Sequence, residues 1–121
     1  MKYSPTLDFN SVWAPGVSYR IERMSFGRRL DLTKQVRSLL ARHEFHAGGE
    51  SPADRVEASA LSMEIDCLYW DWGLLRVDGI DIGDEAATKE SLLTRGPEGL
   101  VHEILSTIKA ECGLTEEERK N

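Results

Sequence analysis

The sequence predicts an α+β fold that is mainly helical, with about four helices, a short N-terminal strand and a small β-hairpin. Apolar residues recur every three or four positions over residues 32–45, 56–68 and 100–108, which is the period of an amphipathic helix. Residues 17–22 alternate strictly between apolar and polar side chains, as a strand with one buried face does. The Asp-Gly pair at 78–79 stands between two short β-prone runs and predicts the hairpin.

The chain has 121 residues, of which 40% are hydrophobic and 30% are charged, a balance typical of one folded domain. Residues 1–16 show no clear period and end in Ala14-Pro15-Gly16, so we expect an N-terminal arm there. Residues 17–121 then form a single helical-rich domain. The first residues carry no apolar signal segment and no apolar run is long enough to span a bilayer, so we expect a cytoplasmic protein that makes no membrane contact.

The predicted strand begins at Val17 and ends before Gly27, with its apolar side chains on one face and its polar ones facing solvent. A helix of about four turns follows and ends near Phe45. The spacing of its apolar residues indicates one buried face. That face consists of Leu32, Val36, Leu39 and Leu40.

The second helix has the clearest start in the chain. Ser51 is a candidate N-cap and Pro52 suits the first helical position, while Gly73 ends the pattern. Two neighbouring apolar stripes predict a wide face that lies centrally in the domain. These stripes are Val56, Ala60, Met63 and Cys67, and beside them Leu61, Ile65 and Leu68.

Two further helices are expected in the C-terminal part. Thr88 caps a short helix that ends near Leu93, and Pro97 opens a longer one that ends at Gly113. The longer helix carries one apolar face, made of Leu100, Val101, Ile104, Leu105 and Ile108. Thr115 to Glu118 has the pattern of a capping box, which predicts the start of one more helix.

Residues with catalytic or metal-binding chemistry do not gather into a recognisable site. His43 and His46 have a helical spacing but no third ligand near them. The acidic run around Asp78–Glu85 lacks the spacing of a calcium loop. Cys67 and Cys112 are expected to be reduced, buried thiols. We therefore predict no catalytic residue, no cofactor and no metal. A hydrolase or metal enzyme is kept as an alternative hypothesis.

The charge is divided unevenly along the chain. Residues 17–46 hold seven basic and three acidic residues, a net charge of +4, whereas residues 47–121 hold seven basic and seventeen acidic residues, a net charge of −10. A basic surface over residues 20–42 suits a small nucleic-acid-binding or regulatory protein, which is the second hypothesis. The overall charge of −6 argues against a broad nucleic-acid footprint.

Three features together resemble the tail assembly chaperones of long-tailed phages and prophages. A polar-alternating strand from Val17 leads into Arg28-Arg29-Leu30-Asp31-Leu32. Trp72-Gly73-Leu74-Leu75 and Val77-Asp78-Gly79 precede a helix that begins with Thr88-Lys89-Glu90. The chain closes with an amphipathic helix and an acidic tail that ends in Lys120-Asn121.

This resemblance implies a non-enzymatic protein that acts in the cytoplasm of a bacterial host cell. Such chaperones cover the long helical tape-measure protein before tail-tube subunits polymerise around it, in the manner of a helix in a groove. The partners implied are thus the tape-measure and tail-tube proteins, and a homo-oligomer is left open. The predicted partner-binding residues are Trp70, Trp72, Leu100, Ile104, Ile108, Arg28 and Arg29.

Overall fold

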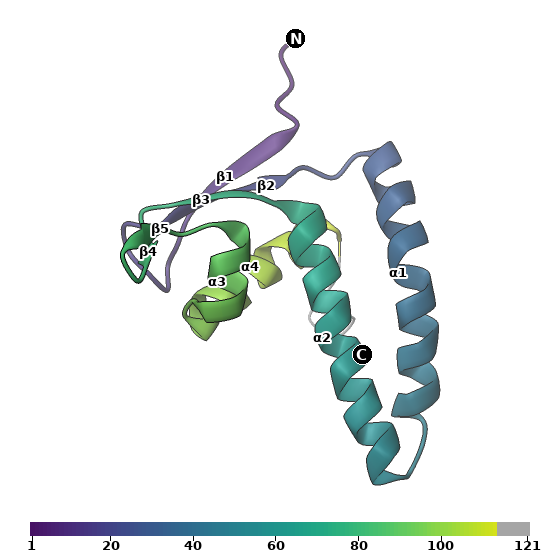
Figure 1. Ribbon diagram of the computed structural model, residues 1–121. Helices are drawn as coiled ribbons and strands as arrows, with labels where there is room; N and C mark the ends of the chain where they lie inside the picture. The colour runs from purple at the N-terminus through teal and green to yellow at the C-terminus, as the bar shows by residue number, and fades with distance from the viewer. Residues whose placement is uncertain (114–121) are drawn as a thin grey trace.

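A three-stranded antiparallel sheet organises the fold (Figure 1). The structure is a computed structural model and describes residues 1–113. Strand β1 (Thr6–Asn10) and strand β3 (Leu74–Asp78) flank strand β2 (Ser18–Glu22), so β2 is the central strand. The fold class is the predicted one, α+β and mainly helical, with four helices in the described part of the chain.

The central strand confirms the predicted alternation. Val17, Tyr19 and Ile21 are buried beneath the helices, whereas Ser18 and Arg20 lie on the opposite, open face of the sheet. Tyr19 pairs with Phe9 on one side and with Val77 on the other, so the buried face is apolar across all three strands. One face of this small sheet therefore belongs to the core and the other meets solvent.

The prediction of a loose arm over residues 1–16 is wrong for Thr6–Asn10, because these residues form β1. They pair with β2 along its full length, and the Phe9 ring stacks on Tyr19 with 5.7 Å between the ring centroids. Ser11 N donates a hydrogen bond of 2.8 Å to Val17 O, which closes the connection between the two strands. The domain boundary expected at residue 16 thus falls inside a hairpin of the sheet. Only Leu7 and Phe9 alternate here, and two apolar residues are too few to show a period.

Helices α1 (Phe26–Ala47) and α2 (Pro52–Gly73) form a helical hairpin between strands β2 and β3. Helix α1 begins earlier than expected because the Ser25 side chain caps it by accepting a hydrogen bond from Arg28 N, which leaves Gly27 inside the first turn. Helix α2 has the predicted bounds, with Ser51 as its N-cap and Pro52 at its start.

The β-hairpin exists, but not at the Asp-Gly pair. It is formed by strands β4 (Asp81–Ile82) and β5 (Glu85–Ala86), which pair across a turn where Gly83 has a φ of 65°. Gly79 has a φ of 89°, and a Cβ there would lie 2.3 Å from Gly16 O. The glycine is therefore needed where the chain leaves the sheet beside the β1–β2 loop, and β3 pairs with β2 instead of folding back on itself.

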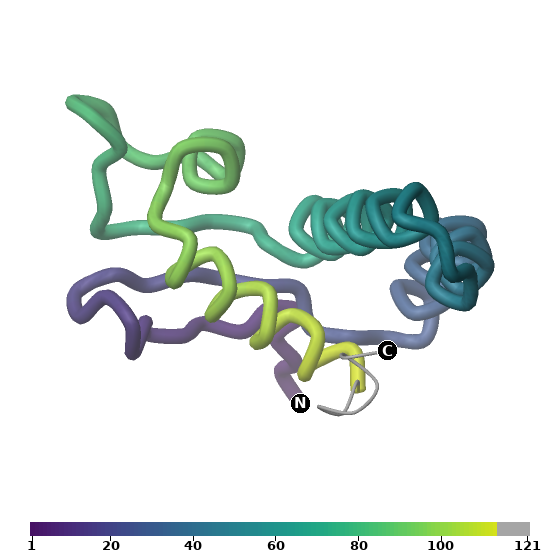
Figure 2. The backbone as a smooth tube through the Cα atoms, turned by 90° about the horizontal axis from the view of Figure 1, so that it is seen from below, coloured from purple at the N-terminus to yellow at the C-terminus, as the bar shows by residue number. Residues whose placement is uncertain are grey.

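Helices α3 (Lys89–Arg95) and α4 (Glu98–Glu111) complete the fold, and the Thr88 cap is confirmed. The five predicted apolar residues of α4 are all buried. Figure 2 shows α4 running along the sheet, and Tyr19 Oη lies 2.8 Å from Thr107 Oγ1 of α4. The capping box predicted at Thr115–Glu118 lies outside the described residues.

Two carboxylates of α4 hold the chain segments that precede and follow strand β2. Glu103 Oε1 accepts hydrogen bonds from Val12 N and Trp13 N, at 2.8 Å and 2.9 Å, and Glu111 Oε2 accepts one from Met24 N. Burial opposes the ionisation of Glu103, but the hydrogen bonds from Trp13 and its neighbours outweigh it and hold the pKa of Glu103 below its usual value. No helix in residues 1–113 has the length and apolarity needed to cross a membrane.

Candidate protein-binding surface

The apolar residues predicted to bind a partner lie in the core. Leu100, Ile104 and Ile108 are fully buried where α4 packs on the sheet, and Trp70 and Trp72 are 1% and 6% exposed. The Trp70 indole donates a hydrogen bond of 3.1 Å to Lys89 O at the start of α3. These five residues have no surface to offer a partner, so the expected contact set is corrected: their helical spacing reflects the interior of the domain.

The two arginines of the predicted set hold the base of α1, Arg28 against α2 and Arg29 against the end of α4. Arg28 donates a hydrogen bond of 2.9 Å to Trp72 O, and its guanidinium carbon lies 4.8 Å from the centroid of the Trp72 ring. Arg29 donates a hydrogen bond of 3.1 Å to Cys112 O at the end of α4. Both side chains therefore join α1 to the ends of α2 and α4, which is a structural role that charge counting could not reveal.

The basic stretch over residues 20–42 does not form one surface. Arg20 lies on the open face of the sheet and is paired with Asp8, whereas Arg28 and Arg29 lie at the start of α1 and bind backbone carbonyls. Further along α1, Arg42 approaches Glu57 of α2 at 3.6 Å. The cations that the sequence places close together thus lie on different elements, and four of them have partners within the chain.

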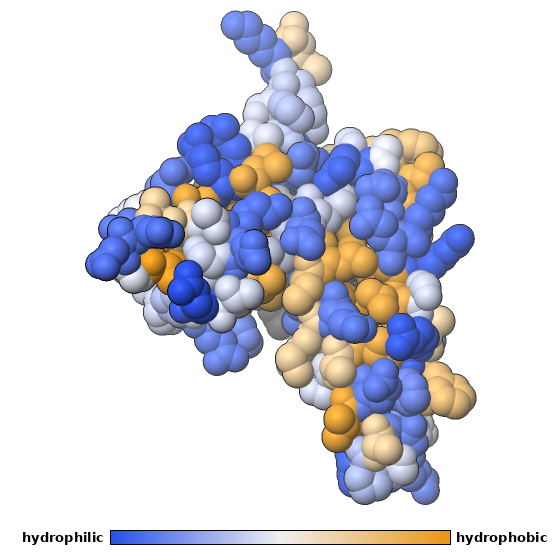
Figure 3. All heavy atoms as spheres, in the orientation of Figure 1, coloured by the Kyte–Doolittle hydropathy of each residue, from blue (hydrophilic) through white to orange (hydrophobic). Residues whose placement is uncertain are grey.

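The far end of the hairpin has a different character from the rest of the molecule. We call residues 37–60 the distal hairpin; all of them are described, and none is buried. Several large apolar side chains there stand in solvent, and Figure 3 shows apolar surface reaching along the hairpin beyond the sheet and the short helices. The exposed ones are Leu40, Phe45 and Val56. Exposed apolar side chains on a projecting element make the hairpin the place to look for a contact surface.

One apolar stripe of α2 is exposed to solvent. We call Val56, Ala60, Met63 and Cys67 the α2 stripe; their spacing places them on one side of the helix, and all four are exposed, Val56 to 71% and Met63 to 61%. The sequence predicted this stripe to lie centrally with its neighbour. Only the neighbouring stripe does so, because Leu61 and Ile65 are buried and Leu68 packs against the core.

Both cysteines are free thiols, as predicted, but only one is buried. Burial raises the pKa of the Cys112 thiol to about 11, and the opposing effect of Arg29 is smaller. Cys67 is exposed in the α2 stripe, contrary to the expectation of a buried residue. Its pKa is raised by partial burial and by the negative charges of Asp71, Asp66 and Glu64, so negative charge surrounds this end of the stripe.

The tip of the hairpin is held by a hydrogen-bonded turn. His46 Nδ1 lies 3.0 Å from Asp54 Oδ1, and Ser51 Oγ donates to Asp54 Oδ2 at 2.8 Å. The hydrogen bonds from His46 and Ser51 lower the pKa of Asp54. His46, which the sequence raised as a metal ligand with His43, thus has a structural partner. In the described part of the chain, no group of three His, Cys, Asp or Glu side chains is arranged to hold a metal.

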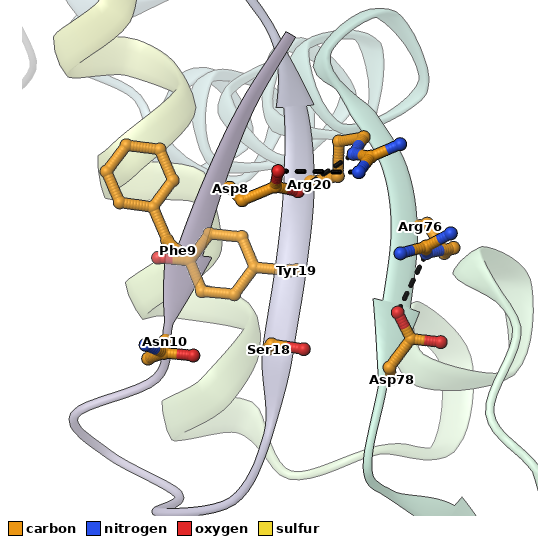
Figure 4. Close-up of a pocket in the computed structure, with 8 residues that line it drawn as sticks. All are labelled: Asp8, Phe9, Asn10, Ser18, Tyr19, Arg20, Arg76 and Asp78. Carbon is orange, nitrogen blue, oxygen red and sulfur yellow. Dashed lines mark hydrogen bonds and ion pairs between the residues drawn. The ribbon is translucent and has the colours of Figure 1, made fainter.

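The open face of the sheet carries a shallow polar hollow of about 300 Å³ (Figure 4). Arg20 Nε and Arg76 Nε lie 2.8 Å from the carboxylates of Asp8 and Asp78, respectively. The hydrogen bond from Arg20 keeps the pKa of Asp8 below its usual value. Each cation in the hollow is matched by a carboxylate, and its lining includes neither a histidine nor a cysteine to act as base or nucleophile. The hollow is therefore a weaker candidate site than the α2 stripe.

Comparison with known proteins adds no relative to this picture: no family model matches the chain, and no curated protein or solved structure is significantly similar to it. The candidate surface rests on the geometry of the chain itself.

Proposed function

We propose that this chain is a non-enzymatic tail assembly chaperone of a phage or prophage, which binds a long helical tape-measure-like protein during tail morphogenesis. The single observation that carries the proposal is the α2 stripe, an exposed run of apolar side chains on a projecting helical hairpin. Apolar surface kept out of the core of a small domain is costly in water, and it is retained where a partner covers it.

The chemistry of the stripe suits a chaperone that must later release its partner. A long helical protein that awaits assembly exposes apolar helix faces, and these aggregate unless another surface shields them. Met63 is flexible and adapts to partners of different shape, and the charged residues around the stripe limit the apolar area that is buried. A modest apolar contact with a charged rim favours binding that tail-tube subunits can displace.

The most direct test combines genomic position with co-purification. We expect the gene to lie between a tail-tube gene and a gene for a very long helical protein, and we expect tagged chain to retain that long protein when the two are co-expressed. Met63→Lys places a charge in the α2 stripe and is expected to abolish retention.

Ser62→Lys is the matched control for this experiment. It adds the same charge one position away. Ser62 is exposed, and successive residues of a helix are rotated by about 100°, so its side chain points away from that of Met63. Retention should survive in this variant. If the long protein is not retained by the unaltered chain, or if Met63→Lys and Ser62→Lys behave alike, the proposed function is wrong.

A further inference from the structure

We propose that the occupant of the α2 stripe is an amphipathic helix whose apolar side is bordered by lysine or arginine. This inference rests on the proposed function and specifies the chemistry of the partner segment. It is carried by the shape of the stripe and by the charges beside it.

The shape of the stripe fits a helix. Val56 and Cys67 are separated by eleven residues, which on a helix is about 16 Å or three turns. Apolar positions at intervals of three and four residues are those that a second helix meets when it packs alongside. Ala60 is small enough at the middle of the stripe to let two helix backbones approach. An extended strand would instead need a free sheet edge, which α2 does not provide.

The charges of α2 specify the polarity of the partner. The helix carries five acidic residues and one basic residue. Three of the acidic residues are engaged, Asp54 by His46, Glu57 by Arg42 and Asp66 by Lys109.

The other two acidic side chains, Glu64 and Asp71, are exposed and form no ion pair with any residue in 1–113. Glu64 follows Met63 directly and Asp71 lies one turn beyond Cys67, so α2 places both carboxylates beside the stripe, and both help to raise the pKa of Cys67. A partner with basic residues at its rim complements these two carboxylates, whereas an acidic partner or a nucleic acid is repelled.

A second copy of this chain is a poorer occupant than a different protein. Helix α1 is basic, with five basic and two acidic residues, but its exposed apolar residues do not form a continuous stripe. Leu30 and Leu40 are exposed to 51% and 42%, and Arg37 is exposed on the same side of the helix between them. Packing α1 of one copy on the α2 stripe of another would press that guanidinium against apolar side chains.

The test uses three helical peptides with the same apolar positions and with flanking positions made of lysine, glutamine or glutamate. Fluorescence anisotropy with the full chain measures the affinity of each peptide. We expect the lysine peptide to bind on the order of tenfold more tightly than the glutamate peptide at low salt, with the difference shrinking as salt is added.

Two sets of variants place the interaction. The double variant Glu64→Gln and Asp71→Asn should remove most of the preference for the lysine peptide while leaving the glutamine peptide unaffected, and Met63→Lys should weaken all three peptides. A matched double variant, Asp81→Asn and Asp84→Asn, removes two exposed carboxylates from the β4–β5 hairpin and should change nothing. Equal affinity for the three peptides, or an unchanged preference in the Glu64 and Asp71 variant, overturns the inference.

Sedimentation of the chain alone tests whether a second copy of the chain covers the stripe. If the chain self-associates with increasing concentration and Met63→Lys abolishes this, the stripe is covered by a second copy and the inference is wrong. If the long helical protein is still retained but the peptides show no charge preference, only this inference fails. If the long protein is not retained and the peptides show no charge preference, the proposed function is wrong as well.

Discussion

The core of this molecule and its distal hairpin are built from similar amphipathic sequence but hold their apolar residues in opposite ways. Helix α4 buries five apolar side chains against the sheet, and Leu100, Ile104 and Ile108 have no exposed surface. From residue 37 to residue 60 no side chain is buried, although Leu40, Phe45 and Val56 are as apolar as those of α4. The difference teaches that helical periodicity alone does not identify the core: a helix face is interior only if another element reaches it.

The largest expected effect sharpens this comparison by truncating one apolar side chain in each region. Ile104→Ala removes a fully buried side chain and should lower the free energy of unfolding by about 2–5 kcal/mol. Val56→Ala, in the distal hairpin, should change it by less than about 0.5 kcal/mol. Urea denaturation of both variants measures the contrast. Similar losses in the two variants would mean that the hairpin is as tightly packed as the core.

The next effect concerns the buried thiol at the end of α4. Because burial raises the pKa of Cys112 from 9.0 to about 11, the unfolded chain loses this proton before the folded chain does. The contribution of this thiol to stability is therefore complete below pH 9 and is lost as the pH rises towards 11, by roughly 2–3 kcal/mol.

The slope of the free energy of unfolding against pH, measured from about pH 9 to about pH 11, checks this prediction. Cys112→Ala should remove part of the alkaline decline, whereas Cys67→Ala, at the exposed thiol, should leave most of it in place. The burial of Tyr19 and Tyr69 raises their pKa values too, so some decline remains in every variant. Parallel curves for the unaltered chain and the Cys112 variant would contradict the assignment.

A smaller effect is expected at the base of the hairpin, where Arg28 joins the start of α1 to the end of α2. Arg28→Met keeps much of the aliphatic stem but removes the hydrogen bond to Trp72 O and the contact of the guanidinium with the indole ring. We expect a loss of about 1–2 kcal/mol. Hydrogen exchange should show faster exchange at the amides of α1 than at those of α4, since the attachment of α1 is weakened. Uniform acceleration in both helices would indicate that the two regions unfold as one unit.

The smallest effect on stability is expected at Met63, in the α2 stripe. Met63→Ser changes an exposed side chain and should alter the free energy of unfolding by less than about 0.5 kcal/mol. If the proposed function is right, it should nevertheless weaken retention of the proposed long helical partner, because it removes apolar surface from the α2 stripe. A thermal unfolding curve together with the co-purification assay tests both parts. A strongly destabilised variant would show that Met63 serves the fold instead.

Much of the fold could be predicted from local sequence, and what failed depended on distant partners. Ser51-Pro52 and Thr88 identify helix starts because a cap acts over a few residues. Strand β1 escaped prediction because Leu7 and Phe9 become strand residues through pairing with β2. The Asp-Gly pair at 78–79 misled for the same reason, since the glycine meets the carbonyl of Gly16 from the β1–β2 loop.

The candidate surface was harder to predict than the fold. Apolar residues at helical spacing read the same whether they are covered or exposed, so Ile104 and Met63 look equivalent in the sequence. Within α2, the size of the side chains does distinguish the exposed stripe from the buried one. The stripe that contains Met63 also contains Ala60 and Cys67, which are small, whereas the stripe that packs inward consists of Leu61, Ile65 and Leu68. Bulk thus marks the side of α2 that fills the interior.

The helical hairpin joins two strands that are neighbours in the sheet, since β2 ends at Glu22 and β3 begins at Leu74. Its root is fixed by the sheet and by the hydrogen bond from Arg29 to Cys112 O, but nothing in the described part of the chain fixes its reach, because the residues beyond Val36 and before Leu61 are not buried. Matched deletions or insertions of whole turns in α1 and α2 would leave the sheet intact. The length of this projection can therefore be changed by such insertions, and with it the distance that the hairpin extends from the sheet, without altering the domain that carries it.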